Sequence, residues 1–349
     1  AACALKADME ATGAAGTICV YGCPAEEIMS GKIVMNDQGV FDDLDVAITW
    51  HPFDRNRVSN DIWQAQDIKN YTFHGLSSHA AKAPEKGRSA LDAAELMNVG
   101  CNYMREHMID AARVHGAITN SGGIAPNVIP SEAQILYAIR APKVTQVQKL
   151  FERMCDIARG AALITGTTVD IKQVAAYSDL INNETLNDLI QENLERVIPI
   201  GYTEEELDYA RKFQSVITEL DKEGLKAIAA DIGGRDRKKE LLETPLWDFI
   251  VDRNSRYGGG GSTDVGDVSW KVPTAHVYVN CYAAGTALHS WQATAHKGMI
   301  AAAKVMANIG AELLLKPELV EKAKEDWKEE LNGEEYPNPL PKDLKPEIW

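Results

Sequence analysis

Two adjacent carboxylates, Glu26 and Glu27, follow an apolar run that has the composition of a β-strand. That run, residues 17–21, is rich in β-branched side chains, and Gly22 and Pro24 end it. Neighbouring side chains in an extended segment point in different directions, so one carboxylate could bind a metal ion while the other takes a proton from water. A solvated acidic loop is the alternative for a Glu-Glu pair taken alone.

Two histidines occupy comparable positions along the chain. His51 follows the apolar run 44–50, and His289 lies just beyond the apolar run 275–282. Because open α/β sheets bind ligands beyond the carboxyl ends of their strands, we predict a metal site made of Glu27, His51 and His289. One carboxylate and two imidazoles suit Zn²⁺, Mn²⁺ or Co²⁺, and the neighbouring glutamate would deprotonate a metal-activated water. A structural role remains the alternative for each histidine.

Other catalytic arrangements have less support in the sequence. The motifs H-E-x-x-H, G-x-S-x-G and G-x-x-x-x-G-K-[ST] do not occur, so zincin, α/β-hydrolase and P-loop assignments lack support. Cys23 could act as a nucleophile paired with His51 or His289, although no neighbour that would activate its thiolate is recognisable. His296 follows His289 on an expected helix, where a surface role is predicted.

Composition limits the class of protein further. The 349 residues are enough for about two domains, and the net charge of −15 argues against nucleic acid or an anionic membrane as a partner. No uninterrupted apolar window of about 18 residues occurs, so no transmembrane helix is expected, and no signal peptide is recognised. The six cysteines show no C-x-x-C spacing, which favours a reducing, cytoplasmic location over a disulfide framework.

The order of elements predicts an α/β fold with a largely parallel buried sheet and an inserted second domain. Residues 66–178 have the order β-α-β-β-α-β, which is the ferredoxin-like unit. Its expected strands are 68–74, 115–121, 132–140 and 167–177, and its expected helices are 89–112 and 144–163. The predicted domains are a catalytic domain in two parts (1–66 and 179–315), the inserted domain (67–178) and a C-terminal extension (316–349).

Several other segments carry expectations. Residues 1–9 have a helical pattern without a preceding cap, which we interpret as a chain that lacks its natural N-terminus, and Cys3 is expected to face the core. The chain is expected to be helical over 186–230 and loop-like up to Lys239. The glycines 258–261 could let backbone approach a site, act as a hinge or form a plain flexible loop. The charged, Pro-rich tail from Lys316 is expected to be a surface extension.

Five short motifs, taken together, resemble the M20 family of dinuclear-metal peptidases and amidohydrolases. They are G-C-P-A-E-E at 22–27, W-H-P at 50–52, S-H-A-A at 78–81, G-I-A-P-N-V-I-P at 123–130 and A-L-H-S at 287–290. The run G-S-T-D-V-G-D-V-S-W at 261–270 narrows the resemblance, which extends over nearly the whole chain. It implies a zinc-peptidase-like catalytic domain with an inserted dimerisation or lid domain.

The resemblance also implies roles for single residues. Glu26 matches the general base, and the metal ligands Glu27, His51 and His289 would serve a centre of two Zn or Mn ions in the complete protein. The family's H-G-C-G-H-N-like motif, which supplies further ligands, is absent and is expected just upstream of Ala1. The chain as given is therefore expected to hold an incomplete centre.

The inserted domain would contribute three more residues. His79 matches a histidine that reaches a partner's active site across a dimer and stabilises an oxyanion, while Asn127 and Arg140 match lid residues that contact substrate. Arg140 would bind a substrate carboxylate. As alternatives, Asn127 could cap the turn at 126–130, and Arg140 could be a surface strand residue.

The expected activity is metal-dependent hydrolysis of the amide bond of an N-acyl amino acid, and the resemblance implies p-aminobenzoyl-glutamate as the substrate. The expected assembly is a homodimer or a heterodimer with a sister subunit. One alternative is hydrolysis of another N-acyl amino acid or a dipeptide. The other is a non-catalytic subunit that supplies only a lid to a catalytic partner.

Overall fold

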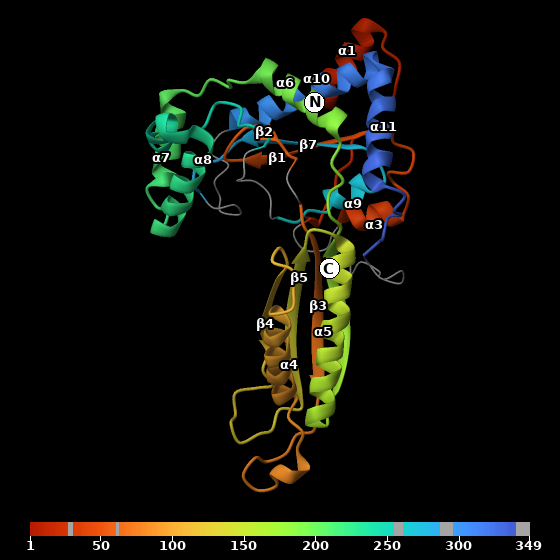
Figure 1. Ribbon diagram of the computed structural model, residues 1–349, viewed down its shortest axis with the longest axis vertical. Helices are drawn as coiled ribbons and strands as arrows, with labels where there is room; N and C mark the ends of the chain where they lie inside the picture. The colour runs from red at the N-terminus through yellow and green to blue at the C-terminus, as the bar shows by residue number, and fades with distance from the viewer. Residues whose placement is uncertain (27–30, 61–62, 255–260, 287–295, 340–349) are drawn as a thin grey trace.

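The computed structural model describes the chain except for residues 27–30, 61–62, 255–260, 287–295 and 340–349. The chain forms two parts, which we call the main domain and the inserted domain (65–177). The inserted domain extends away from the main domain in Figure 1, and the chain passes between the two at both ends of the insertion.

The main domain is built from helices around a small sheet. Its sheet has the order β1-β7-β2, in which β1 and β7 are parallel and β2 and β7 are antiparallel. The sheet is therefore mixed. Its elements are α1 (Ala2–Thr12), α3 (Gly31–Asp37), β1 (Ala47–Phe53), β2 (Arg57–Val58), α6 (Glu184–Val197), α7 (Glu204–Gln214), α8 (Glu219–Glu243), α9 (Val265–Ser269), β7 (Thr274–Asn280), α10 (His296–Leu315) and α11 (Pro317–Leu331).

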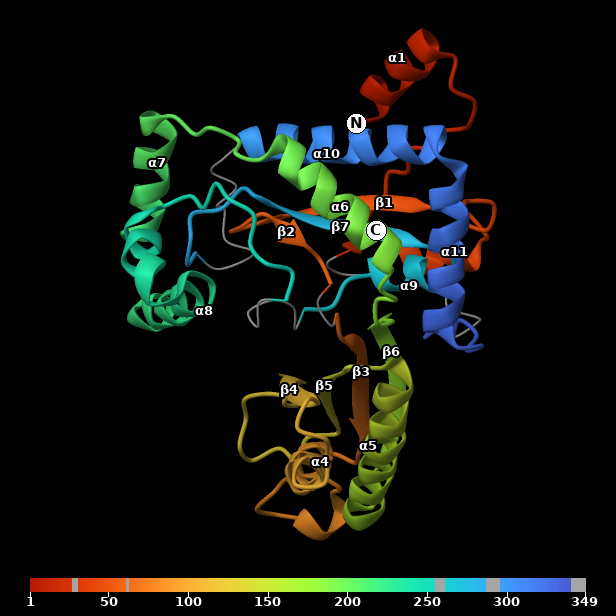
Figure 2. The same cartoon turned by 45° about the horizontal axis from the view of Figure 1, so that its top comes forward.

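The two faces of this sheet have different neighbours because side chains alternate along each strand. Ala275, Val277 and Val279 of β7 pack against buried apolar residues of α6 and α10. The intervening residues His276 and Tyr278 point to the opposite face. Figure 1 places α6 and α10 on the side of the sheet away from the inserted domain, and Figure 2 shows α10 there again, with α6 crossing in front of the sheet.

The inserted domain has the β-α-β-β-α-β order that the sequence predicts. Its strands form an antiparallel sheet in the order β4-β5-β3-β6, and α4 and α5 cover one face of it. Its elements are β3 (Ala65–His74), η1 (Pro84–Lys86), α4 (Ala90–Arg105), β4 (Arg113–Asn120), β5 (Glu132–Ala141), α5 (Val144–Thr165) and β6 (Thr168–Tyr177). Together with the main-domain sheet, this confirms the α/β fold with a ferredoxin-like insertion.

Local sequence accounts for the ends of both helices in the inserted domain. The Ser89 hydroxyl accepts a hydrogen bond from the Asp92 N–H at 3.1 Å, which caps α4. Gly166 ends α5 with φ = 65°, in the left-handed region that favours glycine. Apolar residues of both helices then meet Tyr71, Phe73 and Ile135 from the sheet in one buried core.

The expected strand at 17–21 is wrong. Residues 13–25 form neither helix nor strand, and Val20 is 76% exposed. A strand is stable only when a neighbouring strand satisfies its backbone groups, and no described strand pairs with this segment. β-branched composition alone therefore did not produce a strand here.

Three further expectations also fail. Cys3 is exposed, because the face of α1 that packs on α10 is the one carrying Leu5. α8 continues to Glu243, with a break at Gly234 (φ = 58°), where a loop was expected. The tail is not a plain surface extension, since Ala323 of α11 is fully buried in the core of the main domain.

The tail also contacts the inserted domain and the chain that leads back from it. Trp327 and Tyr336 pack against a buried cluster that joins the core of the inserted domain to Ile181 and Trp270 of the main domain, and the Tyr336 hydroxyl donates to Asp267 at 2.9 Å. The other Asp267 oxygen accepts from the Ser178 N–H at 3.1 Å. A Cβ on Gly266 would lie 2.2 Å from the Ser178 carbonyl oxygen, so glycine is required for this close packing. The junction between the domains is therefore tightly packed.

Among the described helices, α10 is the one long and apolar enough, by length and composition, to cross a membrane. Three of its buried residues, Ala302, Val305 and Ile309, belong to the core that joins α6 and β7. Packing on the sheet therefore accounts for its apolar composition in this structure.

Candidate functional site

Glu26 lies at the junction between the two domains. It is half-buried, and its backbone carbonyl accepts a hydrogen bond of 2.7 Å from the hydroxyl of Tyr177, the last residue of β6. Ala25, just before it, has φ = 61°, a left-handed conformation that is uncommon for a residue other than glycine. The contact with Tyr177 holds the glutamate segment against the inserted domain. Glu27 lies outside the described residues.

His51 lies within β1, not beyond its end as expected. Pairing with β7 extends β1 through Pro52 to Phe53, which places His51 opposite Tyr278. Its ring lies on the face of the sheet that carries Tyr278 and His276, with ring centroids at 6.1 Å and 6.4 Å. This is the face opposite α6 and α10, and it borders the junction.

The His51 ring has the hydrogen bonding expected of a metal ligand. Its Nδ1 lies 2.7 Å from the Pro52 carbonyl oxygen, which can only accept, so Nδ1 carries the proton. Nε2 is then the nitrogen with the lone pair. Metal-binding histidines commonly donate their other N–H to a backbone carbonyl in this way.

The complete ligand set cannot be seen in the described part of the chain. His289, like Glu27, falls in a segment outside it, and no three His, Cys, Asp or Glu side chains come together as a metal site among the residues described. His51 therefore fits a metal, and the other two predicted ligands remain predictions.

A buried polar group beside His51 was missed by sequence reasoning. His276 is 3% exposed, and its Nδ1 lies 2.9 Å from the Ser59 hydroxyl, which also accepts from the Trp63 indole N–H at 2.9 Å. Burial, and to a lesser degree His51 and Lys32, lowers the pKa of His276 to about 3, so the ring is neutral. In the sequence, a single histidine within an apolar strand indicates only a buried position, so nothing there pointed to a polar group near the site.

A second buried group near the site is an ion pair. Lys32 of α3 donates to Asp264 through both its backbone N–H (2.9 Å) and its Nζ (2.6 Å), and Asp264 is fully buried. This pair fastens the segment after Glu26 to the loop before α9. In the sequence, the motif at 261–270, which contains Asp264, was the feature that could have indicated this ion pair.

The surroundings of Cys23, the alternative nucleophile, do not favour its reactive thiolate form. Desolvation raises the pKa of Cys23, and Asp264 adds to the rise while Lys32 opposes it. A raised pKa keeps the thiol protonated, and the thiolate is the nucleophilic form. His296 is exposed at the start of α10, as predicted.

Arg140 lies on β5 at the end of the inserted domain that meets the main domain. The register places Arg113, Arg140, Gln66 and Tyr177 in one row across the four strands. Arg140 is half-buried, and burial lowers its pKa. It therefore shares the junction with Glu26, which Tyr177 contacts.

His79 and Asn127 lie together at the far end of the inserted domain, in the loops that Figure 1 shows at its foot. The Ala80 N–H donates to the Asn127 carbonyl at 2.9 Å, and His79 forms a β-bridge with Val128. Both residues are exposed. The ten residues of β3, at about 3.3 Å each, separate them from the junction by about 30 Å.

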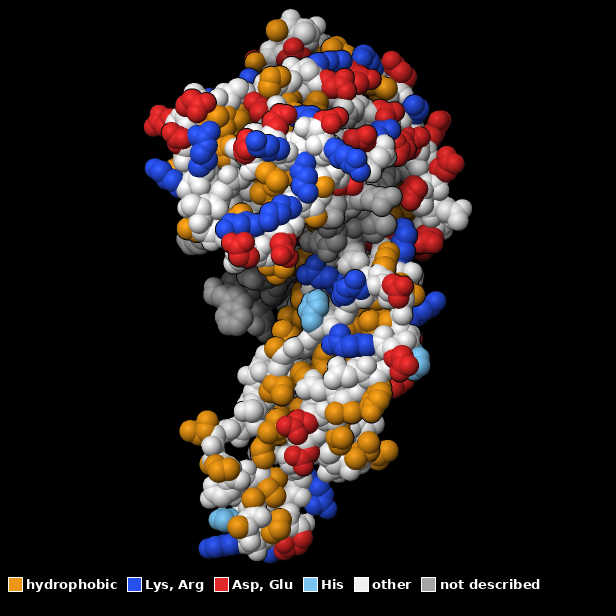
Figure 3. All heavy atoms as spheres, turned by 60° about the vertical axis from the view of Figure 1, so that its left-hand side comes forward, with side chains coloured by type: hydrophobic (Ala, Val, Ile, Leu, Met, Phe, Trp, Pro, Cys, Tyr) orange, Lys and Arg blue, Asp and Glu red, His pale blue; other side chains and the backbone are white. Residues whose placement is uncertain are grey.

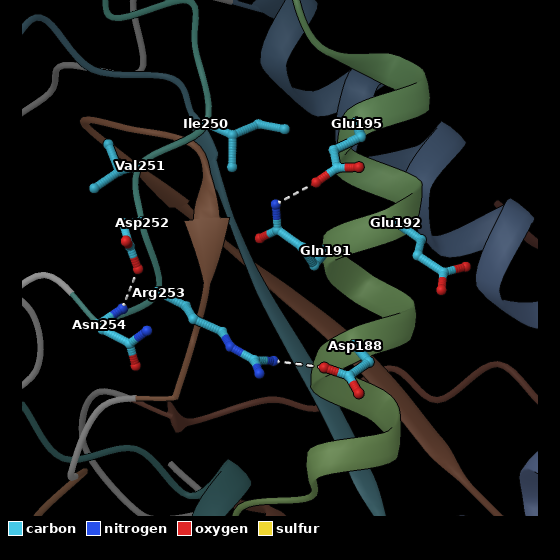
Figure 4. A pocket seen from close by; sticks show the side chains of 9 residues that line it. All are labelled: Asp188, Gln191, Glu192, Glu195, Ile250, Val251, Asp252, Arg253 and Asn254. Atoms are coloured by element: carbon cyan, nitrogen blue, oxygen red, sulfur yellow. Dashed lines mark hydrogen bonds and ion pairs between the residues drawn. The ribbon is translucent and has the colours of Figure 1, made fainter.

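A separate groove lies between α6 and the segment 250–254 (Figure 4). Its charged groups are largely paired with one another: Arg253 contacts Asp188 at 2.7 Å and Glu184 at 3.5 Å, and Gln191 donates to Glu195 at 2.8 Å. None of the predicted site residues lines it, so the groove is not the candidate site.

Comparison with known proteins identifies the class. The family model described as a peptidase dimerisation domain, from the M20 group, matches residues 70–164, which is most of the inserted domain. A crystal structure of an aminobenzoyl-glutamate utilization protein from Klebsiella pneumoniae superposes with a TM-score of 0.58 at 19% identity. That likeness covers 89% of this chain and 65% of the other, and it supports the fold.

Sequence relatives establish the family. The chain is 41% identical to a subunit of p-aminobenzoyl-glutamate hydrolase from Escherichia coli over 99% of its own length and 74% of the relative's. It is 33% identical to Xaa-Arg dipeptidase of Mus musculus over 97% of its length and 69% of that protein. The chain belongs to the M20 family of peptidases and amidohydrolases, and both of these relatives are hydrolases by name.

Proposed function

We propose that this protein hydrolyses the amide bond of an N-acyl amino acid, with p-aminobenzoyl-glutamate as the first substrate to test. The 41% identity to the relative named for that substrate supports the choice. The observation that carries the proposal is the meeting of Glu26 with the inserted domain through the Tyr177 hydroxyl at 2.7 Å. A carboxylate at an interdomain junction, in a chain whose His51 has Nε2 as its unprotonated ring nitrogen, suits metal-assisted amide hydrolysis.

Glu27, His51 and His289 would hold divalent metal, Zn or Mn, with two ions in the complete centre. When bound, the metal lowers the pKa of water and polarises the substrate carbonyl. The Pro52 carbonyl fixes the ring of His51 with Nε2 as its metal-binding atom. On the same face of the sheet, Nδ1 of the neutral His276 ring lies 2.9 Å from the Ser59 hydroxyl.

Glu26 would act as the general base. Its carboxylate accepts a proton from the attacking water and returns that proton to the nitrogen of the leaving amino acid as the amide C–N bond breaks. The hydrogen bond from the Tyr177 hydroxyl is made to the backbone carbonyl of Glu26 and fixes this residue against the inserted domain. The products are the carboxylic acid and the free amino acid.

His79 would serve the active site of a second subunit, because about 30 Å of strand separates it from the junction in its own chain. The Ala81 N–H donates to its Nδ1 at 3.2 Å, so Nε2 carries the proton. An exposed N–H donor of this kind can stabilise the oxyanion of the tetrahedral intermediate. Asn127 on the adjoining loop would contact the same substrate.

The partner is a second copy of this chain or a sister subunit, and the match of a dimerisation-domain model supports either. Arg140 would bind the substrate carboxylate on the inserted domain of the chain that supplies Glu26.

The test is incubation of the metal-loaded protein with p-aminobenzoyl-glutamate, followed through the release of p-aminobenzoate. We expect activity that depends on added Zn²⁺ or Mn²⁺ and disappears with a chelator. Activity on Xaa-Arg dipeptides alone would transfer the substrate assignment to the dipeptidase branch. Absence of turnover on every N-acyl amino acid and dipeptide, with metal bound, would reject the proposal and favour a non-catalytic subunit.

A further inference from the structure

Besides Arg113, which pairs directly with Arg140 and donates to the Ala112 carbonyl at 2.7 Å, three basic side chains gather at the junction end of the inserted domain. His115 of β4 pairs with Ala138, two residues before Arg140 on β5, so His115 and Arg140 are diagonal neighbours on the sheet face that α4 and α5 leave uncovered. Arg105, the last residue of α4, reaches the same strand, where its guanidinium donates to the Val114 carbonyl. Figure 3 shows basic and histidine side chains together on this part of the inserted domain, just below the main domain.

None of the three has a carboxylate partner among the described residues. Arg105 donates instead to the Asn102 side chain at 3.2 Å, and Arg140 Nε is buried without a hydrogen-bond partner within the part of the chain that the structure describes. A buried donor left without an acceptor is costly. In a chain with 51 acidic and 36 basic residues, a basic cluster without a described carboxylate partner is unexpected.

The surroundings of His115 and Arg140 disfavour positive charge on both side chains. Partial burial and then the charges of Arg140 and Arg105 lower the pKa of His115. Burial likewise lowers the pKa of Arg140, because desolvation disfavours its charged form. Like charges at close range are destabilising unless an anion lies between them. The cluster is thus arranged as a receptor for negative charge from outside these residues.

We propose that Arg105, His115 and Arg140 form an anion site that selects substrates whose amino acid carries a second carboxylate. This inference rests on the proposed function, because the ligand of the anion site is the substrate of the proposed amide hydrolysis. It adds Arg105 and His115 as specificity-determining residues. Arg140 lies in one row with Tyr177, with Gln66 of β3 between them, and Tyr177 contacts the backbone of Glu26, so a ligand held here lies at the same end of the inserted domain as Glu26. Guanidinium groups match carboxylates in geometry as well as charge.

The experiment compares N-acetyl-glutamate with its neutral isostere N-acetyl-glutamine by titration calorimetry on the metal-loaded protein. We expect the acidic ligand to bind at least about tenfold more tightly, as charge-assisted hydrogen bonds would give. R105Q and H115Q should each remove most of that preference. R159Q, at an exposed arginine of α5 that pairs with Asp156, should retain it and serves as the matched control.

Equal binding of the two ligands, or a preference that survives in both R105Q and H115Q, would overturn the anion site. Loss of the dimer in either variant by sedimentation would also overturn it, because the cluster would then pair with carboxylates of a second subunit. Hydrolysis of both ligands at equal kcat/KM would reject the inference while leaving amide hydrolysis standing. Selective binding of N-acetyl-glutamate without any hydrolysis would support the anion site and count against amide hydrolysis as the activity.

Discussion

The two ends of the inserted domain differ in their surroundings, because one end packs against the main domain and the other is exposed. At the junction end, Arg140 and Tyr177 lie against the main domain, with Tyr177 bonded to Glu26. At the far end, His79 and Asn127 are exposed on loops that contact mainly each other. The sequence resemblance assigns both ends to one active site, yet a single chain keeps them about 30 Å apart. Under the proposed function, one complete site would therefore take residues from two chains.

The strongest test of the junction end is Glu26→Gln. Loss of the proton acceptor should lower kcat by about 10²–10⁴-fold, the usual contribution of a general base, while metal content stays unchanged. The assay is release of p-aminobenzoate with elemental analysis of bound metal. Glu10→Gln, at an exposed glutamate of α1, is the control and should leave both unchanged. Normal turnover in Glu26→Gln would remove the residue as the base.

The far end is tested by His79→Ala. Loss of an oxyanion donor should lower kcat by about 10²-fold and leave the dimer intact in sedimentation. Mixing the Glu26→Gln and His79→Ala proteins should restore part of the activity, since a hybrid dimer contains one site with both residues. No recovery on mixing, with subunit exchange demonstrated, would place the two residues in the same chain's site and reject the two-chain arrangement.

The contribution of the junction to stability is tested through Asp267. This residue is fully buried and accepts hydrogen bonds from the Ser178 N–H and the Tyr336 hydroxyl. Burial raises its pKa to about 7. The folded protein then holds a proton that the unfolded chain releases near pH 4, so this group's contribution to stability is complete below about pH 4 and is lost as pH rises to about 7.

The measurement is Tm against pH for the wild type and Asp267→Asn. We expect the variant to show a smaller decline in Tm between about pH 4 and pH 7, because the amide does not ionise. Identical slopes in the two proteins would show that Asp267 stays ionised in the fold. Asp252→Asn, at an aspartate outside the junction, is a matched control.

The smallest expected effect is that of Asn127→Ala. The side chain is exposed at the far end, so the free energy of unfolding should change by no more than about 0.5 kcal/mol. If Asn127 contacts substrate in the partner's site, KM should rise while kcat changes little, as steady-state kinetics would show. An unchanged KM would favour the alternative that Asn127 serves its own turn.

Much of the fold could be predicted from local patterns. The strands and helices of the inserted domain follow from alternation and helical periodicity, and caps such as Ser89 are visible in the sequence. The end of β1 could not be predicted, because Pro52 reads as a terminator and pairing with β7 carries the strand past it. The segment 17–21 failed for the converse reason, since it has strand-forming residues and no described partner strand.

The residues of the candidate site also fall into two groups, those that the sequence predicted and those that it did not indicate. Glu26 and His51 were predicted from residue types that suit metal-assisted hydrolysis at expected strand ends, but the structure has no strand before Glu26 and places His51 within β1. His276 and Asp267 were missed, because burial and distant contacts give them their properties. Ser59 and Trp63 fix His276 from another part of the chain, and Tyr336 reaches Asp267 from the tail.

The sequence by itself determined the residue types available for chemistry, the family and the β-α-β-β-α-β order of the inserted domain, because short-range periodicity and motifs encode these features. Only the tertiary structure decided which residues meet. It joined Glu26 to Tyr177, gathered Arg105, His115 and Arg140 without a described carboxylate, and put His79 at the opposite end. Strand register and domain packing set such distances, and they depend on contacts between segments far apart in the chain.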